Sequence, residues 1–213
     1  MDRTEGHVFV IDDDLSVCRG LSRLLHSAGY TVETFTSAKD YLLRESYDGV
    51  ACIVLDVRMP QLSGTELQDI LNSQKSNIPI IFLTAHGDVP LAVDTMKKGA
   101  EDFLTKPVEE KQLLDAVERA LHNHDKTRRN QLEIADAQAR LDHLTPREME
   151  VLQCVIGGAT NKQIAEVLNI SEKTVKIHRG KVMHKLNVSS AAELGWVSSF
   201  LSVAVKKKSS TSI

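Results

Sequence analysis

Side chains that could handle a phosphoryl group stand at the ends of four apolar runs in the first half of the sequence. They are Asp12, Asp13, Asp56, Thr84 and Lys106. Carboxylates gathered in one place repel each other and need a cation, and hard oxygen ligands favour Mg²⁺. A lysine ammonium and a threonine hydroxyl donate the hydrogen bonds that phosphoryl oxygens accept. The set therefore predicts a carboxylate nucleophile beside a magnesium site.

Asp56 is the candidate nucleophile because it directly ends a run of four apolar residues, 52–55, which is typical of a strand buried on both faces. Pro60 then prevents the strand from continuing. Each polar residue also has an ordinary structural explanation, since acids start helices, threonines cap them and lysines lie on surfaces. Their joint position at strand ends favours the chemical interpretation.

Strands and helices alternate through residues 1–123, a pattern typical of a parallel sheet covered by helices on both faces. The predicted strands are residues 7–11, 31–35, 52–55, 79–83 and 102–105. The predicted helices are residues 15–28, 38–44, 64–74, 89–98 and an amphipathic stretch around 113–121. Crossovers in such sheets are right-handed, so the strand ends and their polar residues meet at one edge.

Over about residues 5–123 the chain resembles the receiver domain of bacterial two-component response regulators. The resemblance rests, in this order, on Asp12-Asp13, on Asp56 followed by Met59-Pro60, on Thr84-Ala85 and on Lys106-Pro107. It implies an α/β flavodoxin-like fold whose five-stranded parallel sheet has the strand order 2-1-3-4-5.

The resemblance also implies roles for these residues. Asp56 would accept a phosphoryl group from the phosphohistidine of a sensor histidine kinase. Asp13 and Asp56, with the main-chain carbonyl of Arg58, would bind Mg²⁺, and Asp12 would assist through water. Lys106 would pair with the phosphoryl oxygens.

Switch residues follow from the same resemblance. Thr84, next to Ala85, would move to hydrogen-bond a phosphoryl oxygen, and Phe103 would be buried when Thr84 is drawn inward. The Lys106–Pro107 bond would be cis. Residues 86–93 narrow the resemblance to the FixJ branch of the FixJ/NarL family, in which the helix after Thr84 and the strand holding Phe103 form the homodimer face. Apolar residues of this helix could equally pack against the sheet.

A second domain begins with an unusually complete helix start. Thr145 can cap the helix, Pro146 takes its first position and Glu148 completes a capping box. Asn161 is predicted to cap a second short helix, and Ser171 a third over residues 172–186. Two helices joined by a short turn form a helix-turn-helix.

The third helix of this domain is basic on one face and apolar on the other. Glu172 is its only acid, and Val175, Val182 and Leu186 lie opposite the lysines. A solvated basic surface is the ordinary alternative. A basic outward face behind a short turn favours insertion into the major groove of double-stranded DNA.

Residues 142–203 resemble the LuxR-type four-helix DNA-binding domain of the same family, on residues 144–148, 161–165, 171–179 and 185–186. The resemblance implies contacts to bases or phosphates by Lys173, Thr174, Lys176, Ile177, His178, Lys181 and Lys185. Gly180 stands where some relatives carry a base-contacting lysine. A fourth helix over about residues 191–201, with Leu194, Trp196 and Val197, would serve as a dimer face.

The composition of the 213-residue chain, 42% hydrophobic and 26% charged, fits one or two globular domains. Residues 1–123 hold 12 Lys+Arg against 20 Asp+Glu, whereas residues 142–213 hold 10 against 6. The basic end indicates either a polyanionic partner or a solvated surface. No apolar run could span a bilayer, and three distant cysteines argue against disulfides and zinc, so we expect a cytoplasmic protein without membrane contact.

We predict a receiver domain over residues 1–123, a helical linker over 124–141, an all-α DNA-binding domain over 142–205 and a disordered basic tail over 206–213. The linker lacks Gly and Pro and fits either a helical spacer or a short coiled coil across a dimer.

These features together predict a response regulator that is not an enzyme. Phosphorylation of Asp56 would promote a homodimer that binds promoter DNA and, with RNA polymerase, activates transcription. One alternative is an aspartyl phosphatase with Asp12 as nucleophile, although Glu109-Glu110 poorly supplies the acidic pair that such an enzyme needs. The other is an adaptor with a vestigial receiver.

Overall fold

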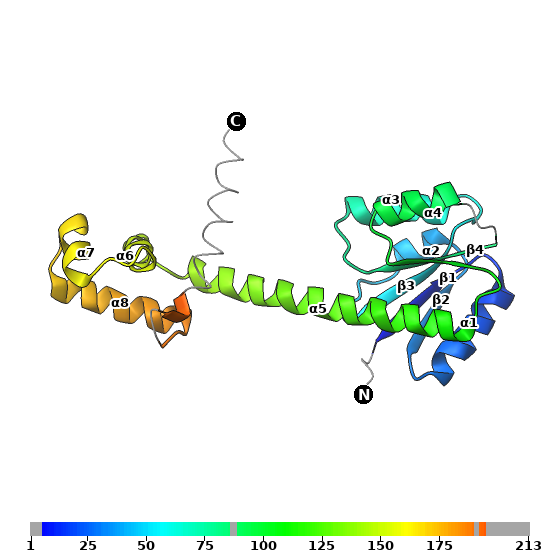
Figure 1. Cartoon of the computed structure of the whole chain (residues 1–213), viewed down its shortest axis with the longest axis horizontal. Coiled ribbons are helices and arrows are strands. Elements are labelled where there is room, and N and C mark those ends of the chain that lie inside the picture. The colour runs from blue at the N-terminus through cyan, green and yellow to red at the C-terminus, as the bar shows by residue number, and fades with distance from the viewer. Residues whose placement is uncertain (1–5, 86–88, 190–191, 195–213) are drawn as a thin grey trace. The chain divides into compact units, whose positions relative to one another are not determined.

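A computed structural model describes residues 6–85, 89–189 and 192–194 of the chain (Figure 1). The chain folds as two compact units, Met1–Arg129 and Asn130–Ile213, which we describe separately as unit 1 and unit 2. None of the helices in the described ranges combines the length and the apolar character that crossing a membrane requires.

Unit 1 contains a five-stranded sheet in which every pairing is parallel. The strands are β1 (His7–Ile11), β2 (Thr31–Phe35), β3 (Ala51–Asp56), β4 (Ile80–Thr84) and β5 (Asp102–Thr105). Their order is β2-β1-β3-β4-β5, which confirms the predicted strand order. All five strands run in one direction, so their carboxyl ends lie at one edge of the sheet.

Helices cover both faces of this sheet because side chains alternate between the faces along each strand. Val8 and Val10 face α1 (Leu15–Ser27) and the first part of α5 (Glu110–Asp142). Phe9 and Ile11 face a second core cluster that includes residues of α2 (Ala38–Leu43) and α3 (Gly64–Ser73). Leu91 of α4 (Val89–Lys97) packs against that second cluster. The continuous apolar runs of β1 and β3 follow from burial on both faces.

Helix α5 continues through the segment that the sequence predicts as a linker. The division between the units falls after Arg129, inside α5. Two contacts tie this part of the helix to unit 1: the Ala51 backbone N–H donates to His124 Nδ1 at 3.0 Å, and Arg128 Nη2 donates to the Asp48 carbonyl at 2.6 Å. Unit 1 therefore includes the first turns of the predicted linker.

Unit 2 is built from three described α-helices and a short 3₁₀ helix. They are α6 (Pro146–Ile156), α7 (Asn161–Leu168), α8 (Glu172–Leu186) and η1 (Ala192–Leu194). Leu152, Val182 and Leu194 share one apolar cluster, and Val151, Ile164 and Val175 form another. The helical arrangement agrees with the predicted helix-turn-helix. Most of the predicted fourth helix, with Trp196 and Val197, and the tail 206–213 lie outside the described residues.

The caps of unit 2 agree with the sequence at two of the three helices. Thr145 and Glu148 form the predicted capping box, and Ser171 caps α8. The prediction for α7 is wrong by one residue. Thr160 caps this helix, because its hydroxyl accepts from the Gln163 backbone N–H at 3.3 Å and the Gln163 side chain accepts from the Thr160 N–H in return.

The three cysteines are free thiols at different depths. Cys18 and Cys52 are buried in unit 1, where burial raises the pKa of each thiol. Cys154 is half-buried in unit 2.

Candidate phosphoacceptor site and nucleic-acid interface

Asp12, Asp56 and Lys106 meet at the carboxyl edge of the sheet. The Lys106 ammonium lies 2.5 Å from Asp12 Oδ2 and 2.5 Å from Asp56 Oδ1. Asp12 follows β1 and Asp56 ends β3, which are paired strands. Lys106 follows β5, and its backbone N–H donates to the Thr84 carbonyl at 2.6 Å. The Lys106–Pro107 bond is cis, as the resemblance implied. The predicted convergence of these residues is confirmed by these contacts.

Asp56 is held on both sides of its carboxylate. Its Oδ2 accepts from the Arg58 backbone N–H at 2.7 Å, while Oδ1 accepts from Lys106. The residue is 7% exposed and ends a strand that is buried along its whole length. One acidic side chain therefore ends an otherwise apolar strand, in a fixed orientation.

Gly64 is required by the close approach of α3 to this strand. A Cβ atom on Gly64 would lie 2.2 Å from the Asp56 carbonyl oxygen, which is far inside van der Waals contact. The Gly64 N–H donates to the Val57 carbonyl at 3.0 Å, so the start of α3 is bonded to the chain just after Asp56. The glycine thus fixes the backbone beside Asp56.

Burial and ion pairing shift the pKa values of Asp12 and Lys106 in opposite directions. Burial raises the pKa of Asp12 above its usual value, although hydrogen bonds from Lys106 and the Asp14 N–H oppose the rise. Burial lowers the pKa of Lys106, but its hydrogen bonds to Asp12 and Asp56 outweigh that effect and leave the pKa raised. Lys106 is therefore a cation that lies between two carboxylates.

The remaining predicted metal ligands are less closely gathered. Asp13 and Arg58 are exposed. Across residues 6–85, 89–189 and 192–194, no three His, Cys, Asp or Glu side chains form a group able to hold a metal ion. Asp12 and Asp56 therefore come together, whereas Asp13 does not complete a triad of carboxylates with them.

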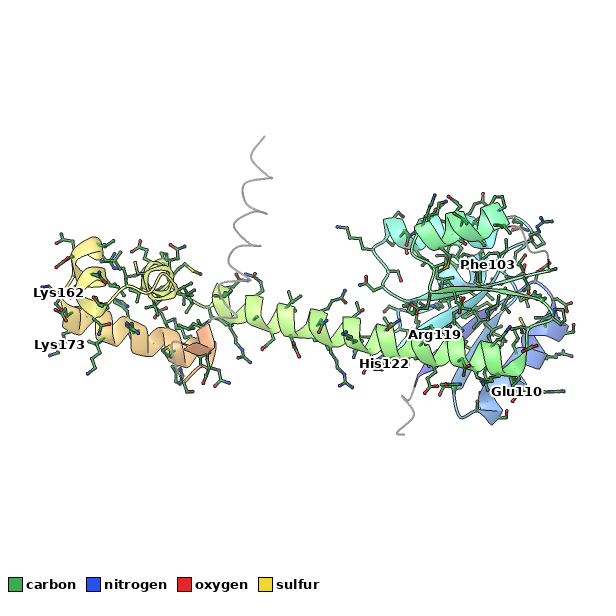
Figure 2. The ribbon with its side chains drawn as sticks, viewed as in Figure 1. Phe103, Glu110, Arg119, His122, Lys162 and Lys173 are labelled. Atoms are coloured by element: carbon green, nitrogen blue, oxygen red, sulfur yellow. The ribbon has the colours of Figure 1, made fainter. Side chains whose placement is uncertain are left out.

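Thr84 and Phe103 lie on the paired strands β4 and β5. Thr84 is 2% exposed and ends β4, whereas Ala85 directly after it is exposed. Phe103 of β5, labelled in Figure 2, is half-buried. Its ring centroid lies 6.2 Å from that of Phe82. The Phe103 ring therefore lies partly in the core and partly at the surface of unit 1.

Helix α8 presents its predicted basic face to solvent. Val175, Val182 and Leu186 are buried, as predicted for the inner face. The predicted contact residues Lys173, Lys176, Ile177 and Lys181 are exposed, and Thr174 and His178 are half-buried. Figure 2 shows Lys173 at the start of this helix. The exposed set offers three ammonium groups and one apolar side chain to a partner.

Lys185, which was predicted to contact DNA, has its ammonium engaged inside unit 2. It donates to Glu148 Oε2 at 2.7 Å and to the His143 carbonyl at 3.1 Å. This ion pair is the main cause that lowers the pKa of Glu148 to about 2, with the Thr145 N–H adding to it. The position of Lys185 on the basic helix could not predict this contact, because Glu148 is distant in sequence.

Two arginines also bind within unit 2. Arg179 Nη1 donates to Asn161 Oδ1 at 2.9 Å and so links α8 to the first residue of α7. Arg147 Nη2 donates to the Leu168 carbonyl at 2.5 Å, at the other end of α7. The first contact joins the two helices of the helix-turn-helix, and the second joins α6 to the end of α7.

Lys162 was not predicted as a contact residue. It is exposed in the first turn of α7 (Figure 2). Its place at the start of the first helix of the helix-turn-helix could have made it a candidate for contacting DNA phosphates, because that helix crosses the DNA backbone.

Two known families match the two parts of the chain. The family described as "Response regulator receiver domain" matches residues 8–118. The family described as "Bacterial regulatory proteins, luxR family" matches residues 142–197.

Similar proteins cover nearly the whole chain. Nodulation protein W of Bradyrhizobium diazoefficiens is 42% identical over 99% of this chain and 92% of its own length. The transcriptional regulatory protein FixJ of the same organism is 42% identical over 90% of this chain and 93% of its own. The response regulator protein TodT of Pseudomonas putida is 42% identical over 88% of this chain and 82% of its own length.

Solved structures of response regulators are also similar to this chain. The response regulator StyR, at 48% identity, has a TM-score of 0.85 over 89% of this chain and 96% of its own. Full-length FixJ from B. japonicum, at 40% identity, has a TM-score of 0.57 over 94% of this chain and 98% of its own.

Proposed function

Because this chain belongs to the two-component response regulators that join a receiver domain to a LuxR-type DNA-binding domain, we propose that phosphorylation of Asp56 controls its binding to promoter DNA. The observation that supports this most directly is the Lys106 ammonium, 2.5 Å from both Asp56 and Asp12 at the carboxyl edge of the sheet. A charged lysine beside a buried, oriented carboxylate suits the transfer of a phosphoryl group.

The phosphoryl donor in this proposal is the phosphohistidine of a sensor histidine kinase. An Asp56 carboxylate oxygen forms a bond to phosphorus, and the bond between phosphorus and the imidazole nitrogen breaks with its electron pair going to nitrogen. The product is an acyl phosphate on Asp56. Lys106 lies where it can pair with the phosphoryl oxygens and stabilise their charge.

Mg²⁺ fits the residues of this site. Asp56 and the Arg58 carbonyl would supply oxygen donors and Asp12 would assist through water, since Mg²⁺ commonly uses one or two carboxylates and keeps several waters. Asp13 is exposed and is not gathered with Asp12 and Asp56, and in this proposal it would be the second carboxylate ligand. A bound Mg²⁺ would neutralise charge on the phosphoryl oxygens.

Thr84 and Phe103 are the proposed switch. We place the response in a homodimer that uses α4 and β5, because Val89, Val93 and Met96 of α4 are 70%, 47% and 44% exposed. Apolar side chains gathered at a surface are commonly covered by a partner. The dimer would bring two DNA-binding domains to two half-sites, recruit RNA polymerase and activate transcription in the cytoplasm.

The DNA contacts in this proposal come from the exposed face of α8. Lys173, Lys176 and Lys181 would reach phosphates or base edges, with Thr174, Ile177 and His178 beside them. Lys185 contributes by holding α8 against α6 through Glu148, so a change there would act on DNA binding through the fold.

Labelling with acetyl phosphate and Mg²⁺ tests the proposal. We expect a phosphoryl group on the wild-type protein, no label on Asp56→Asn, and retained label on Asp12→Asn. The labelled protein should bind its promoter more tightly than the unlabelled protein. The reverse labelling pattern would support an aspartyl phosphatase, and absence of label from any phosphoryl donor would support an adaptor.

A further inference from the structure

Gly180 is an unexplained glycine in the middle of α8. A glycine inside a helix costs about 1 kcal/mol relative to alanine. Gly180 has an ordinary helical backbone, so its conformation does not require glycine. Apart from the helix's own backbone, no heavy atom of the described residues lies within 4 Å of a Cβ built on it. Neither its conformation nor packing by the described residues therefore accounts for this glycine.

Gly180 lies on the exposed face of α8, within the set of cationic residues. Lys176 and Ile177 precede it by one helical turn, and Lys181 follows it directly. Residues three and four apart share a helix face, so Ile177 and Gly180 are neighbours on that surface. Ile177 is 52% exposed, which leaves an apolar side chain beside bare backbone, with lysines on both sides.

We propose that Gly180 is the point where α8 comes closest to DNA, and that Gly180 with Ile177 selects a base pair carrying a thymine methyl group. A residue without a side chain lets the backbone approach a ligand closely. An apolar side chain in the major groove contacts the thymine methyl, whereas the flanking lysines can bind phosphates. This inference rests on the proposed binding of promoter DNA.

The chain offers a matched control in Gly20. It is an exposed glycine inside α1, and a Cβ atom there also has no heavy atom of the described residues within 4 Å, apart from the helix's own backbone. Replacing either glycine by alanine removes the same helix penalty. Only the change at Gly180 places a methyl group on the proposed DNA-facing surface.

The first experiment selects binding sites from random double-stranded DNA with the full chain, treated with acetyl phosphate and Mg²⁺. We expect Gly20→Ala to bind the selected site as the wild type does. We expect Gly180→Ala to bind it about tenfold or more weakly, with a change below about twofold on random DNA. Both variants should unfold at a higher temperature than the wild type, which shows that they are folded.

The second experiment replaces each thymidine of the selected site by deoxyuridine, which removes only the methyl group. We expect one position at which this replacement weakens the wild type but has no further effect on Gly180→Ala. Gly180→Ala binding as tightly as Gly20→Ala would overturn the close approach. If the removal of each methyl group weakened DNA binding by the wild type and by Gly180→Ala to the same extent, the thymine contact would be overturned. Failure of the wild type to enrich any site would instead overturn the proposed function.

Discussion

At the scale of single residues, Lys106 lies between two carboxylates that would otherwise repel each other. Its ammonium is 2.5 Å from an oxygen of each, and the side chains of Asp12 and Asp56 are only 3% and 9% exposed. The lysine is 22% exposed, so solvent reaches one side of the cluster. A cation is thus part of the resting site, and removing it should affect both stability and metal binding.

We expect Lys106→Met to lower the free energy of unfolding by about 1–3 kcal/mol, because two buried carboxylates lose their partner. Added Mg²⁺ should raise the unfolding temperature of this variant more than that of the wild type. Denaturation with and without Mg²⁺ measures both effects. Lys98→Met, which removes an exposed lysine from Asp69 and Asp94, should show no such response to Mg²⁺. An equal response of Lys106→Met and wild type would contradict the proposed metal site.

Gly64 makes a second residue-scale prediction. Gly64→Ala should lower the free energy of unfolding by about 1–3 kcal/mol, because its methyl group would meet the Asp56 carbonyl oxygen at 2.2 Å. The displacement of the backbone beside Asp56 should also slow labelling of Asp56 by acetyl phosphate, which mass spectrometry can follow. Gly20→Ala serves as the control and should stabilise the chain slightly. Unchanged stability in Gly64→Ala would show that the backbone beside Asp56 can adjust.

At the scale of elements, one ion pair joins the start of α6 to the end of α8. Glu148 caps α6 by accepting from the Thr145 N–H at 2.9 Å, and it binds Lys185 at 2.7 Å. The lowered pKa of Glu148, about 2 against an ordinary 4.5, means that its charged form stabilises the folded state. This stabilisation is fully present above about pH 4.5 and is lost as the pH falls towards 2.

We therefore expect Glu148→Gln to unfold more easily than the wild type at neutral pH, by about 1–3 kcal/mol. The difference should shrink between pH 4.5 and pH 2, where the wild-type carboxylate becomes protonated. Glutamine retains an oxygen that can cap α6, so the comparison isolates the charge. Denaturant unfolding across this pH range measures it, with the exposed Glu150→Gln as control. A difference that is independent of pH would contradict the assignment.

Local signals predicted the elements better than they predicted the contacts between them. Apolar runs located the strands, and the strand-helix alternation predicted that Asp12, Asp56 and Lys106 would meet. The strand order came from the family resemblance, because periodicity does not determine which strands are neighbours. The engagement of Lys185 by Glu148 could not be read from α8, since the partner lies on another helix. The cap of α7 was misplaced because Thr160 and Asn161 are both good capping residues.

At the scale of the whole molecule, the proposed control of DNA binding depends on a surface of unit 1 that the described residues of that unit leave exposed. Val93 of α4 is 47% exposed, and Val89 and Met96 on the same helix are exposed as well. These side chains do not take part in the core cluster that Leu91 contacts. They are therefore available to a second copy of the chain.

We expect Val93→Asp to remain monomeric after treatment with acetyl phosphate, with at least a roughly tenfold weaker dimer, because a charge would be buried at the interface. Labelling of Asp56 should be unaffected. Sedimentation of the labelled protein measures the change. Val167→Asp, at a 73% exposed position of α7, is the matched control. Dimerisation of the labelled Val93→Asp at wild-type concentrations would show that another surface forms the dimer.

The depths of the three thiols give the chain native reporters of local opening. Cys18 and Cys52 are protected by the core of unit 1, and their raised pKa values keep them protonated and unreactive at neutral pH. An alkylating reagent can modify them only when unit 1 opens, whereas Cys154 in unit 2 is half-buried and gives a reference rate for a more accessible thiol. The rates at Cys18 and Cys52 therefore tell, without any added probe, whether unit 1 loosens when the chain is treated with acetyl phosphate.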